Sequence, residues 1–476
     1  MKSAVVKLIS VLGAAVIIFA AFGLTRYLSD QFPDKFSGKP LAAMALFWLA
    51  AACFVLAAVK FKLKTVYACI GVFTLSLLFQ RVYGAFVTIE GESDLRFYFS
   101  NAVSIFQNGF RHESLYSATF PGTVTYPAVL AVLFKFIGVG RGIPVLLNQL
   151  VMSATIVMAY LYMRRRHGPA SGAVCAMLLA THPFVIIYCN VCNAEILYGA
   201  CILWCFFSFC FARERYASHA QKRWFICPAF FLGLSLLFRP LGVVMLIALA
   251  IYALFYMAAG TKDKLMICSV LLAGYMAFNL LCGAVVKGIT SYDAPRSSYG
   301  WNLYVGGSEE GRWNQADGAE FARVMALSET PTEVQAYFAP KAFARYKDMG
   351  AGILRHCLNK LERWHAAEYI SRLDEESARA NTLTKDDYML PVSVYYVPIL
   401  LLALAFFLWS CVRSFLGKID EMSILTLYTI GSFAALMLLE LSPRYTVSYH
   451  IMFSLPAFEL VAGLTALRHG KRKKTG

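Results

Sequence analysis

The chain has 476 residues, of which 59% are hydrophobic and 15% are charged. Soluble domains are about 45–50% apolar and about 25% charged, so this composition excludes an ordinary soluble protein and indicates a membrane protein. The net charge of +16 would suggest a nucleic-acid partner if the chain were soluble. In a membrane protein the same excess follows from basic cytoplasmic loops, and no nucleic-acid partner is predicted.

Apolar stretches recur along the chain from its first residues. A helix that crosses a bilayer needs roughly 20 mainly apolar residues, so we predict an all-α polytopic membrane protein with about twelve transmembrane helices. The expected spans are 4–24, 41–59, 65–84, 142–163, 169–188, 194–212, 224–238, 240–259, 264–286, 391–412, 421–441 and 446–467.

Basic residues determine the predicted topology. If both termini are cytoplasmic, most basic residues of the short loops lie inside, including the Arg triplet at 164–166 and the tail from 468 to 474. The apolar stretch 126–137 is too short to cross the bilayer upright. We expect it to lie in the outer interface, because a crossing there would move the Arg triplet outside.

The spans divide the chain into four regions. Two extra N-terminal transmembrane helices occupy 1–64, and a transmembrane core with the first outer loop at 84–141 occupies 65–286. An outer-loop domain follows at 287–390, and its periodic apolar residues predict a mainly helical fold. The last region, 391–476, holds the C-terminal transmembrane helices and a basic cytoplasmic tail.

Glu92 and Asp94 form an acidic pair in the first outer loop, where a helix is expected to begin. An acidic residue in the first turn is favoured by the helix dipole and can act as an N-cap. Alternatively, partial desolvation at the membrane surface would raise the basicity of Asp94 and suit it as a general base. The pair can also hold a divalent cation, although no metal site is favoured and no cofactor is predicted.

Further charged residues are expected at the outer ends of the spans. A fixed guanidinium matches the oxygens of a phosphate, so the basic residues together predict an anionic ligand on this face. Acidic residues near membrane depth are also functional candidates, although one at a helix start can be a simple cap. The basic candidates are Lys135, Arg141, Arg239 and Arg444, and the acidic ones are Glu195 and Glu440, the latter four residues before Arg444.

Several short motifs carry a family resemblance. They are DLRFYFSNA at 94–102, TYPAVLAVLFKFIGVG at 125–140, FRPLG at 238–242, NLYVGGSEEGRWNQAD at 302–317 and SPRY at 442–445. In this order they resemble membrane glycosyltransferases of superfamily C, and in particular bacterial members similar to glycosyltransferase family 39. That family includes protein O-mannosyltransferases and lipid A aminoarabinose transferases.

The resemblance implies a sugar donor linked through one phosphate to a polyprenol and used at the outer face of the cytoplasmic membrane. It implies that Asp94 is the catalytic base and that Arg141 binds the donor phosphate, with Lys135, Arg239 and Arg444 as further candidates. Protein mannosyltransferases of the family have Asp-Glu where this chain has Asp94-Leu95. This departure counts against a protein acceptor and leaves the donor assignment unchanged. The expected acceptor is an envelope glycan, a lipid or a protein.

The expected reaction is an inverting transfer of the sugar to an acceptor hydroxyl, next to membrane lipids. On the second outer loop, Trp301, Tyr304 and Trp313 can stack on a sugar or pack in a core. Two alternative functions remain open. A flippase or transporter of lipid-linked sugars would explain the helices and the outer arginines, but not a folded outer loop. A polymerase or ligase that uses diphosphate-linked glycans would also need outer arginines.

Overall fold

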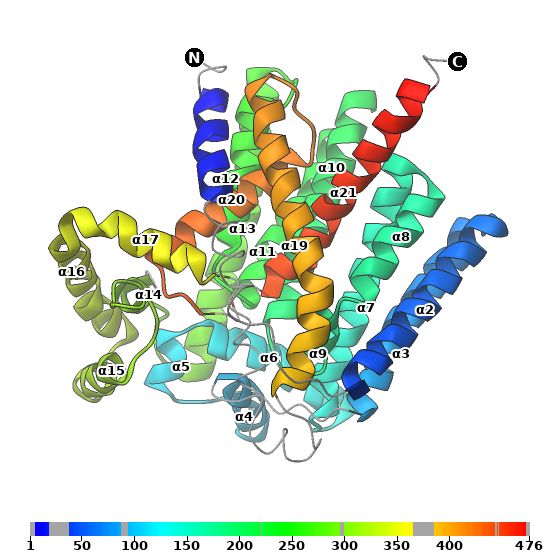
Figure 1. Ribbon diagram of the computed structural model, residues 1–476. Coiled ribbons are helices and arrows are strands. Elements are labelled where there is room, and N and C mark those ends of the chain that lie inside the picture. Colours follow the sequence, from blue (N-terminus) through cyan, green and yellow to red (C-terminus); the bar gives the residue numbers. More distant parts are fainter. Residues whose placement is uncertain are drawn as a thin grey trace.

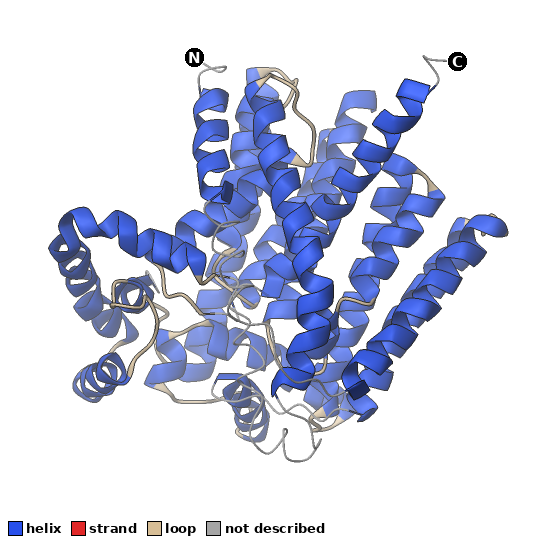
Figure 2. Cartoon of the chain, viewed as in Figure 1, coloured by secondary structure: helices blue, strands red, loops and turns tan. Residues whose placement is uncertain are grey.

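A computed structural model of the chain describes residues 5–18, 38–86, 94–219, 221–295, 299–364, 385–442, 445 and 447–472. This part of the chain is built from helices joined by loops, without any strand (Figure 2). The all-α class predicted from the sequence is therefore confirmed for the described residues.

Five described helices are long and apolar enough to cross a membrane. They are α3 (Thr65–Phe86), α7 (Gly142–His167), α10 (Glu195–His219), α13 (Thr261–Thr290) and α19 (Lys385–Phe415). A sixth span is possible if α8 (Pro169–Ala180) and α9 (Pro183–Cys189) act together, although a 56° bend separates them. The predicted number of about twelve spans and the predicted position of the termini stay predictions.

The other predicted spans correspond to shorter or partly described apolar helices. These include 5–18, α2 (Gly38–Lys60), α12 (Gly242–Ile251) with a π-helical end at 252–256, α20 (Ser423–Leu438) and α21 (Val447–Arg472). The expected span 224–238 consists of three pieces: η1 (Lys222–Phe225), α11 (Ile226–Leu234) and η2 (Ser235–Leu237). A short 3-10 turn lies at each end of α11, so the regular α-helix is only nine residues long. 3-10 turns are frequent at the ends of α-helices.

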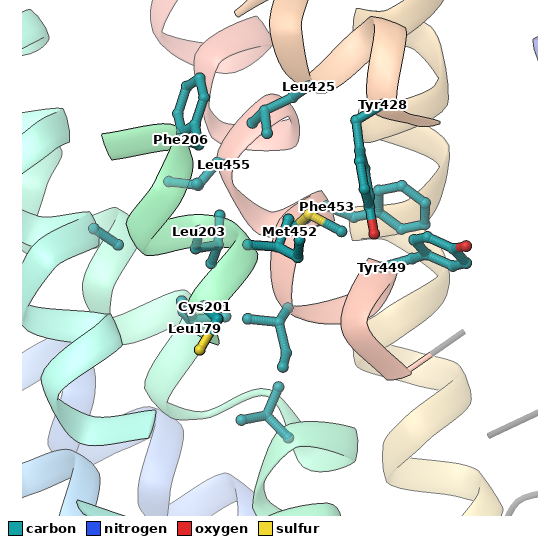
Figure 3. Close-up of a cluster of buried hydrophobic side chains, with 14 of the residues drawn as sticks. Leu179, Cys201, Leu203, Phe206, Leu425, Tyr428, Tyr449, Met452, Phe453 and Leu455 are labelled. Carbon is teal, nitrogen blue, oxygen red and sulfur yellow. The ribbon is translucent and has the colours of Figure 1, made fainter. Parts of the chain in front are cut away.

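The core of the bundle surrounds α10, most of whose side chains are buried. Figure 3 draws Leu203 of α10 in one buried cluster with Leu179 of α8, Leu425 of α20 and Met452 of α21, and Met452 lies beside Leu203. The hydroxyl groups of Tyr198 and Tyr428 meet at 3.0 Å in this core. Such a buried pair is tolerated because each hydroxyl provides a hydrogen-bond partner for the other.

One end of the bundle carries a small helical layer formed by α4 (Asp94–Gln107), α5 (Leu115–Thr119) and α6 (Gly122–Ile137) (Figure 1). Helix α6 contains the apolar stretch expected in the interface. It buries residues along one side against α4, and the Asn101 side chain joins the two helices by donating to the Thr123 carbonyl at 3.0 Å. The helix begins four residues before the predicted stretch 126–137.

The described part of the loop that the sequence predicts to be the second outer loop is also helical, as predicted. It comprises α14 (Tyr299–Gly306), α15 (Gln315–Leu327), α16 (Pro331–Met349), η4 (Gly350–Gly352) and α17 (Ile353–Glu362), and we call residues 299–362 the outer domain. Its own core contains Trp301, Val334 and Phe338. Helices α15 and α16 begin at the side-chain caps Asn314 and Thr330, which accept hydrogen bonds from the first-turn amides.

A buried charge network lies at the opposite end of the bundle, where α7 ends. Arg166 pairs with Glu421 and with Glu459, the latter at 2.7 Å, and Arg213 of α10 pairs with Glu421. The Glu459 carboxylate also contacts His167 at 2.8 Å. The network connects α7, α10, α21 and the start of α20, and it lies on the side that the sequence predicts to be cytoplasmic.

Candidate functional site

The start of α10 carries Glu195, which the sequence analysis selected. The Asn193 side chain accepts a hydrogen bond from the Ile196 amide at 3.1 Å and so caps the helix. The backbone before the cap is held by Asn148 of α7, whose amide group donates to the Val191 carbonyl at 2.9 Å. Glu195 itself is therefore not the cap, and its buried carboxylate is available to another element.

That element is the turn before α12, which carries Arg239. The Arg239 guanidinium forms an ion pair with Glu195, and the two side chains are only 14% and 3% exposed. The turn is fixed by the Arg239 amide, which donates to the Ser235 carbonyl at 3.0 Å, and by Thr125 of α6, which donates to the Leu237 carbonyl at 2.6 Å. Two residues predicted separately are thus one buried pair.

A small cleft with a free volume of about 50 Å³ lies next to this pair. It is formed by the turn before α12, the end of α20, residues between α20 and α21, the start of α21 and α14 of the outer domain. Its polar wall consists of Arg239, Tyr299, Asn302, Ser432, Glu440, Tyr445 and Tyr449. Its apolar wall includes Leu241, Ala435, Leu436 and Leu439.

Glu440 lines the cleft from a segment that is not helical. The sequence placed it near the end of a helix, at pairing distance from Arg444, but α20 ends at Leu438 and the spacing rule for helices does not apply. Glu440 instead accepts a hydrogen bond from the Tyr445 hydroxyl at 3.2 Å. The ring of Tyr445 in turn lies 5.2 Å from the Arg239 guanidinium. Tyr445 therefore contacts both the Glu440 carboxylate and the Arg239 guanidinium at the cleft.

Asp94 begins α4, as the sequence predicts, but its side chain is outside the described residues. Tyr98, one turn later on the helix, packs edge-on against Tyr126 of α6 at 5.3 Å. Tyr126 packs against Phe238 at 6.2 Å, and Phe238 directly precedes Arg239. The first turns of α4 are therefore joined by two aromatic contacts to the turn that bears Arg239.

The remaining charged candidates lie elsewhere or outside the described residues. Arg141 is at the exposed N-terminal end of α7, with its guanidinium 6.0 Å from the Phe99 ring of α4. Lys135 is exposed in the last turn of α6. Within the described part of the chain neither lines the cleft. Glu92 and Arg444 lie outside the described residues.

The three aromatic candidates of the outer domain fall into two groups. Trp301 and Tyr304 are buried in the domain core, where Arg345 covers the Tyr304 ring at 3.4 Å. Trp313 is 58% exposed and its ring lies against Gly318. Of the three candidates, Trp313 alone therefore presents its ring to solvent.

Sequence reasoning missed the polar residues that complete the cleft. Asn302 and Tyr445 belong to two of the motifs noted above, yet nothing in those motifs marked them individually. Ser432 and Tyr449 lie inside predicted spans, where a hydroxyl is unremarkable. Tyr299 lies on α14 and donates to the Pro240 carbonyl at 3.4 Å, and burial raises the pKa of its phenol, which stays protonated.

The lining of the cleft is amphipathic. Leucine and alanine side chains in the lining can cover an apolar chain, and the polar lining residues offer one guanidinium, one carboxylate, an amide and several hydroxyl groups. Such a set of a few polar groups in a largely apolar pocket is typical of small-molecule sites. Within the described residues, no three His, Cys, Asp or Glu side chains lie close enough to hold a metal ion.

The sequence comparison adds a family. Residues 123–282 match the model of the family described as dolichyl-phosphate-mannose-protein mannosyltransferase. The match spans about a third of the chain, and it confirms the predicted resemblance to membrane glycosyltransferases over that segment. The segment contains Arg141, Glu195 and Arg239, whereas Asp94 and Glu440 lie outside it. No curated protein sequence matches the chain.

Solved structures give weaker likenesses. The oligosaccharyltransferase of Archaeoglobus fulgidus in the apo form has 13% identity and a TM-score of 0.49, with 86% of this chain and 52% of that chain covered. ArnT from Cupriavidus metallidurans bound to undecaprenyl phosphate has 15% identity and a TM-score of 0.36, with 83% and 78% covered. The chain thus spans about half the length of the archaeal enzyme. At these values neither likeness bears on the chemistry of this chain.

Proposed function

We propose that the chain transfers a sugar from a polyprenyl-monophosphate-sugar donor to an acceptor hydroxyl at the outer face of the cytoplasmic membrane. One observation carries the proposal: Arg239, inside the segment that matches the mannosyltransferase family, lines an amphipathic cleft at one end of a helical membrane bundle. The acceptor would be an envelope glycan, a lipid or a protein.

The cleft suits such a donor in three parts. The first isoprenoid units would lie along Leu241 and Leu436, and the phosphate would meet the Arg239 guanidinium, whose fork matches phosphate oxygens. The sugar hydroxyl groups would meet the carboxylate of Glu440 and the hydroxyl groups of the polar wall. Because Glu195 already balances the charge of Arg239, a bound phosphate needs a second cation. Arg444, next to Tyr445 in the chain, is our candidate.

Asp94 would act as the general base. It would take the proton of the acceptor hydroxyl while that oxygen forms a bond to the anomeric carbon, and the bond from this carbon to the phosphate oxygen would break with inversion. Polyprenyl phosphate would leave with the electron pair. General base catalysis contributes roughly 10²–10⁴-fold, so most of the acceleration must come from positioning and from stabilisation of the leaving phosphate.

The binding part of the proposal can be tested at Arg239. Purified protein in lipid would be titrated with polyprenyl monophosphate and polyprenyl diphosphate, comparing the wild type with Arg239→Lys and with the charge-neutral double variant Glu195→Gln/Arg239→Gln. Arg323→Gln, at an exposed position of the outer domain, is the control.

We expect both cleft variants to bind the monophosphate at least about tenfold more weakly, since a fixed, fork-shaped guanidinium is lost, while the control binds normally. Equal binding by all variants would remove Arg239 from the donor site. A preference of the wild type for the diphosphate would favour the polymerase or ligase alternative.

A further inference from the structure

Lys360 of α17 is a buried lysine in the outer domain, with only 2% of its surface exposed. Its ammonium group donates to the Gly306 carbonyl at 3.0 Å and to the Leu439 carbonyl at 2.6 Å. Gly306 is the last residue of α14, and Leu439 is the C-cap of α20. Terminal carbonyls of helices lack intrahelical partners and carry partial negative charge, so one ammonium group satisfies the ends of two helices.

Other outer-domain side chains reach the same end of α20. Tyr346 donates its hydroxyl to the Leu438 carbonyl at 2.5 Å, and the Cys357 thiol lies 3.7 Å from the Met437 carbonyl. The backbones also approach closely, because a Cβ added to Gly306 would lie 2.3 Å from the Leu438 carbonyl oxygen. Three successive carbonyls of the α20 end, 437–439, are therefore bound by the outer domain.

The segment directly after α20 is held by the outer domain as well. The Glu440 amide donates to the Asn302 carbonyl and the Leu441 amide donates to the Gly311 carbonyl, both at 2.8 Å. Glu440 is thus fixed on both sides by contacts to the outer domain, and its side chain reaches the cleft beside Tyr445.

We propose that Lys360 is a positioning residue: by joining the end of α14 to the end of α20, it sets the segment 439–442 and thereby the place of Glu440 in the cleft. The contribution to turnover rests on the proposed function, whereas the contribution to the order of the segment does not. Burial lowers the pKa of Lys360 to about 7. The neutral amine keeps N–H donors for both carbonyls, so the contact persists on either side of that pH.

A glycine provides a second way to disturb this contact. The aliphatic stem of Lys360 passes Gly311, where an added Cβ would lie 2.7 Å from the lysine Cδ. Gly311 also has a φ of +67°, which favours glycine. Gly311→Ala should therefore displace Lys360 without removing its charge.

The test measures hydrogen exchange of the peptide 436–445 in the full-length protein in lipid, with no donor present. The variants are Lys360→Met and Gly311→Ala, and the control is Lys347→Met, at an exposed position of the same domain. We expect exchange of this peptide to rise about tenfold or more in the first two variants, since loss of buried hydrogen bonds promotes local opening, and to be unchanged in the control. Unchanged exchange in both Lys360→Met and Gly311→Ala would overturn the proposal. If one of these variants failed to fold, unchanged exchange in the other would overturn it.

Turnover supplies the second readout. We expect kcat at saturating donor to fall about tenfold in Lys360→Met while KM for the donor changes less than about threefold, because a misplaced group costs rate even when the donor is still held. Faster exchange with normal turnover would overturn the positioning role in the reaction. Absence of turnover in the wild type would count against the proposed function, and the exchange data would still decide the role of Lys360 in ordering the segment.

Discussion

Replacing Glu195 by Gln should have two opposite effects, because the carboxylate balances a buried arginine. Glu195 and Arg239 are 3% and 14% exposed, so removing one partner leaves a charge in a poorly solvated place. Breaking a buried ion pair costs about 3–5 kcal/mol, and we expect Glu195→Gln to lower the free energy of unfolding by about 3 kcal/mol. The same change frees the Arg239 guanidinium for an external anion, so polyprenyl phosphate should bind more tightly.

The double variant Glu195→Gln/Arg239→Gln gives the coupling between the two groups. It removes both charges, so its loss of stability should be smaller than the sum of the two single losses by about 1–3 kcal/mol. Stability would be measured by denaturant titration in mixed micelles, and lipid binding by titration of the same preparations. A Glu195→Gln variant of unchanged stability, with additive single losses, would refute the inference that this is a buried, mutually dependent pair.

Three further predictions concern the outer domain. Gly306→Ala should cost about 1–3 kcal/mol of stability through overpacking, because the new methyl group has no room beside the end of α20; a Tm equal to that of the wild type would argue against this close contact. The hydrogen bond from Lys341 is the main cause that lowers the pKa of Glu320 to about 2 from an ordinary 4.5. The resulting stabilisation, about 1–2 kcal/mol after allowance for solvent screening, should be fully present above pH 4.5 and lost as the pH falls toward 2, and a Glu320→Gln variant should lack this pH dependence in thermal melts. Trp301→Ala should cost about 3–5 kcal/mol and Trp313→Ala less than about 0.5 kcal/mol, and equal losses in urea titration would contradict their different burial.

The sequence was sufficient for the helical class and for the positions of most long helices, because apolar length is a local property. Helices α7 and α10 begin within a residue of the expected spans 142–163 and 194–212. The bend between α8 and α9 was not predicted. It occurs at His182-Pro183, where a proline restricts the residue before it and favours a helix boundary, a signal that the continuous apolar run 169–188 concealed.

The site was predictable residue by residue but not as an arrangement. Glu195 and Arg239 were both selected, yet they are 44 positions apart and no local spacing rule joins them. Glu440 was selected for a helical spacing that does not exist, because α20 ends at Leu438, where outer-domain side chains bind its last carbonyls. The outer domain contributes Tyr299 and Asn302 to the cleft through long-range packing, which a single sequence does not encode in any local pattern.

The central claim is that this chain transfers a sugar with Asp94 as its base. The most direct measurement supplies purified protein in lipid with radiolabelled polyprenyl-monophosphate hexoses and follows the release of polyprenyl phosphate in the wild type, in Asp94→Asn and in the control Glu113→Gln. Glu113 is an exposed carboxylate in the same outer loop. We predict release by the wild type and by Glu113→Gln, and a loss of roughly 10²-fold or more in Asp94→Asn. Near-normal release by Asp94→Asn would contradict the assignment of the base, and binding of these lipids without release by any protein would contradict the transferase itself and favour a flippase.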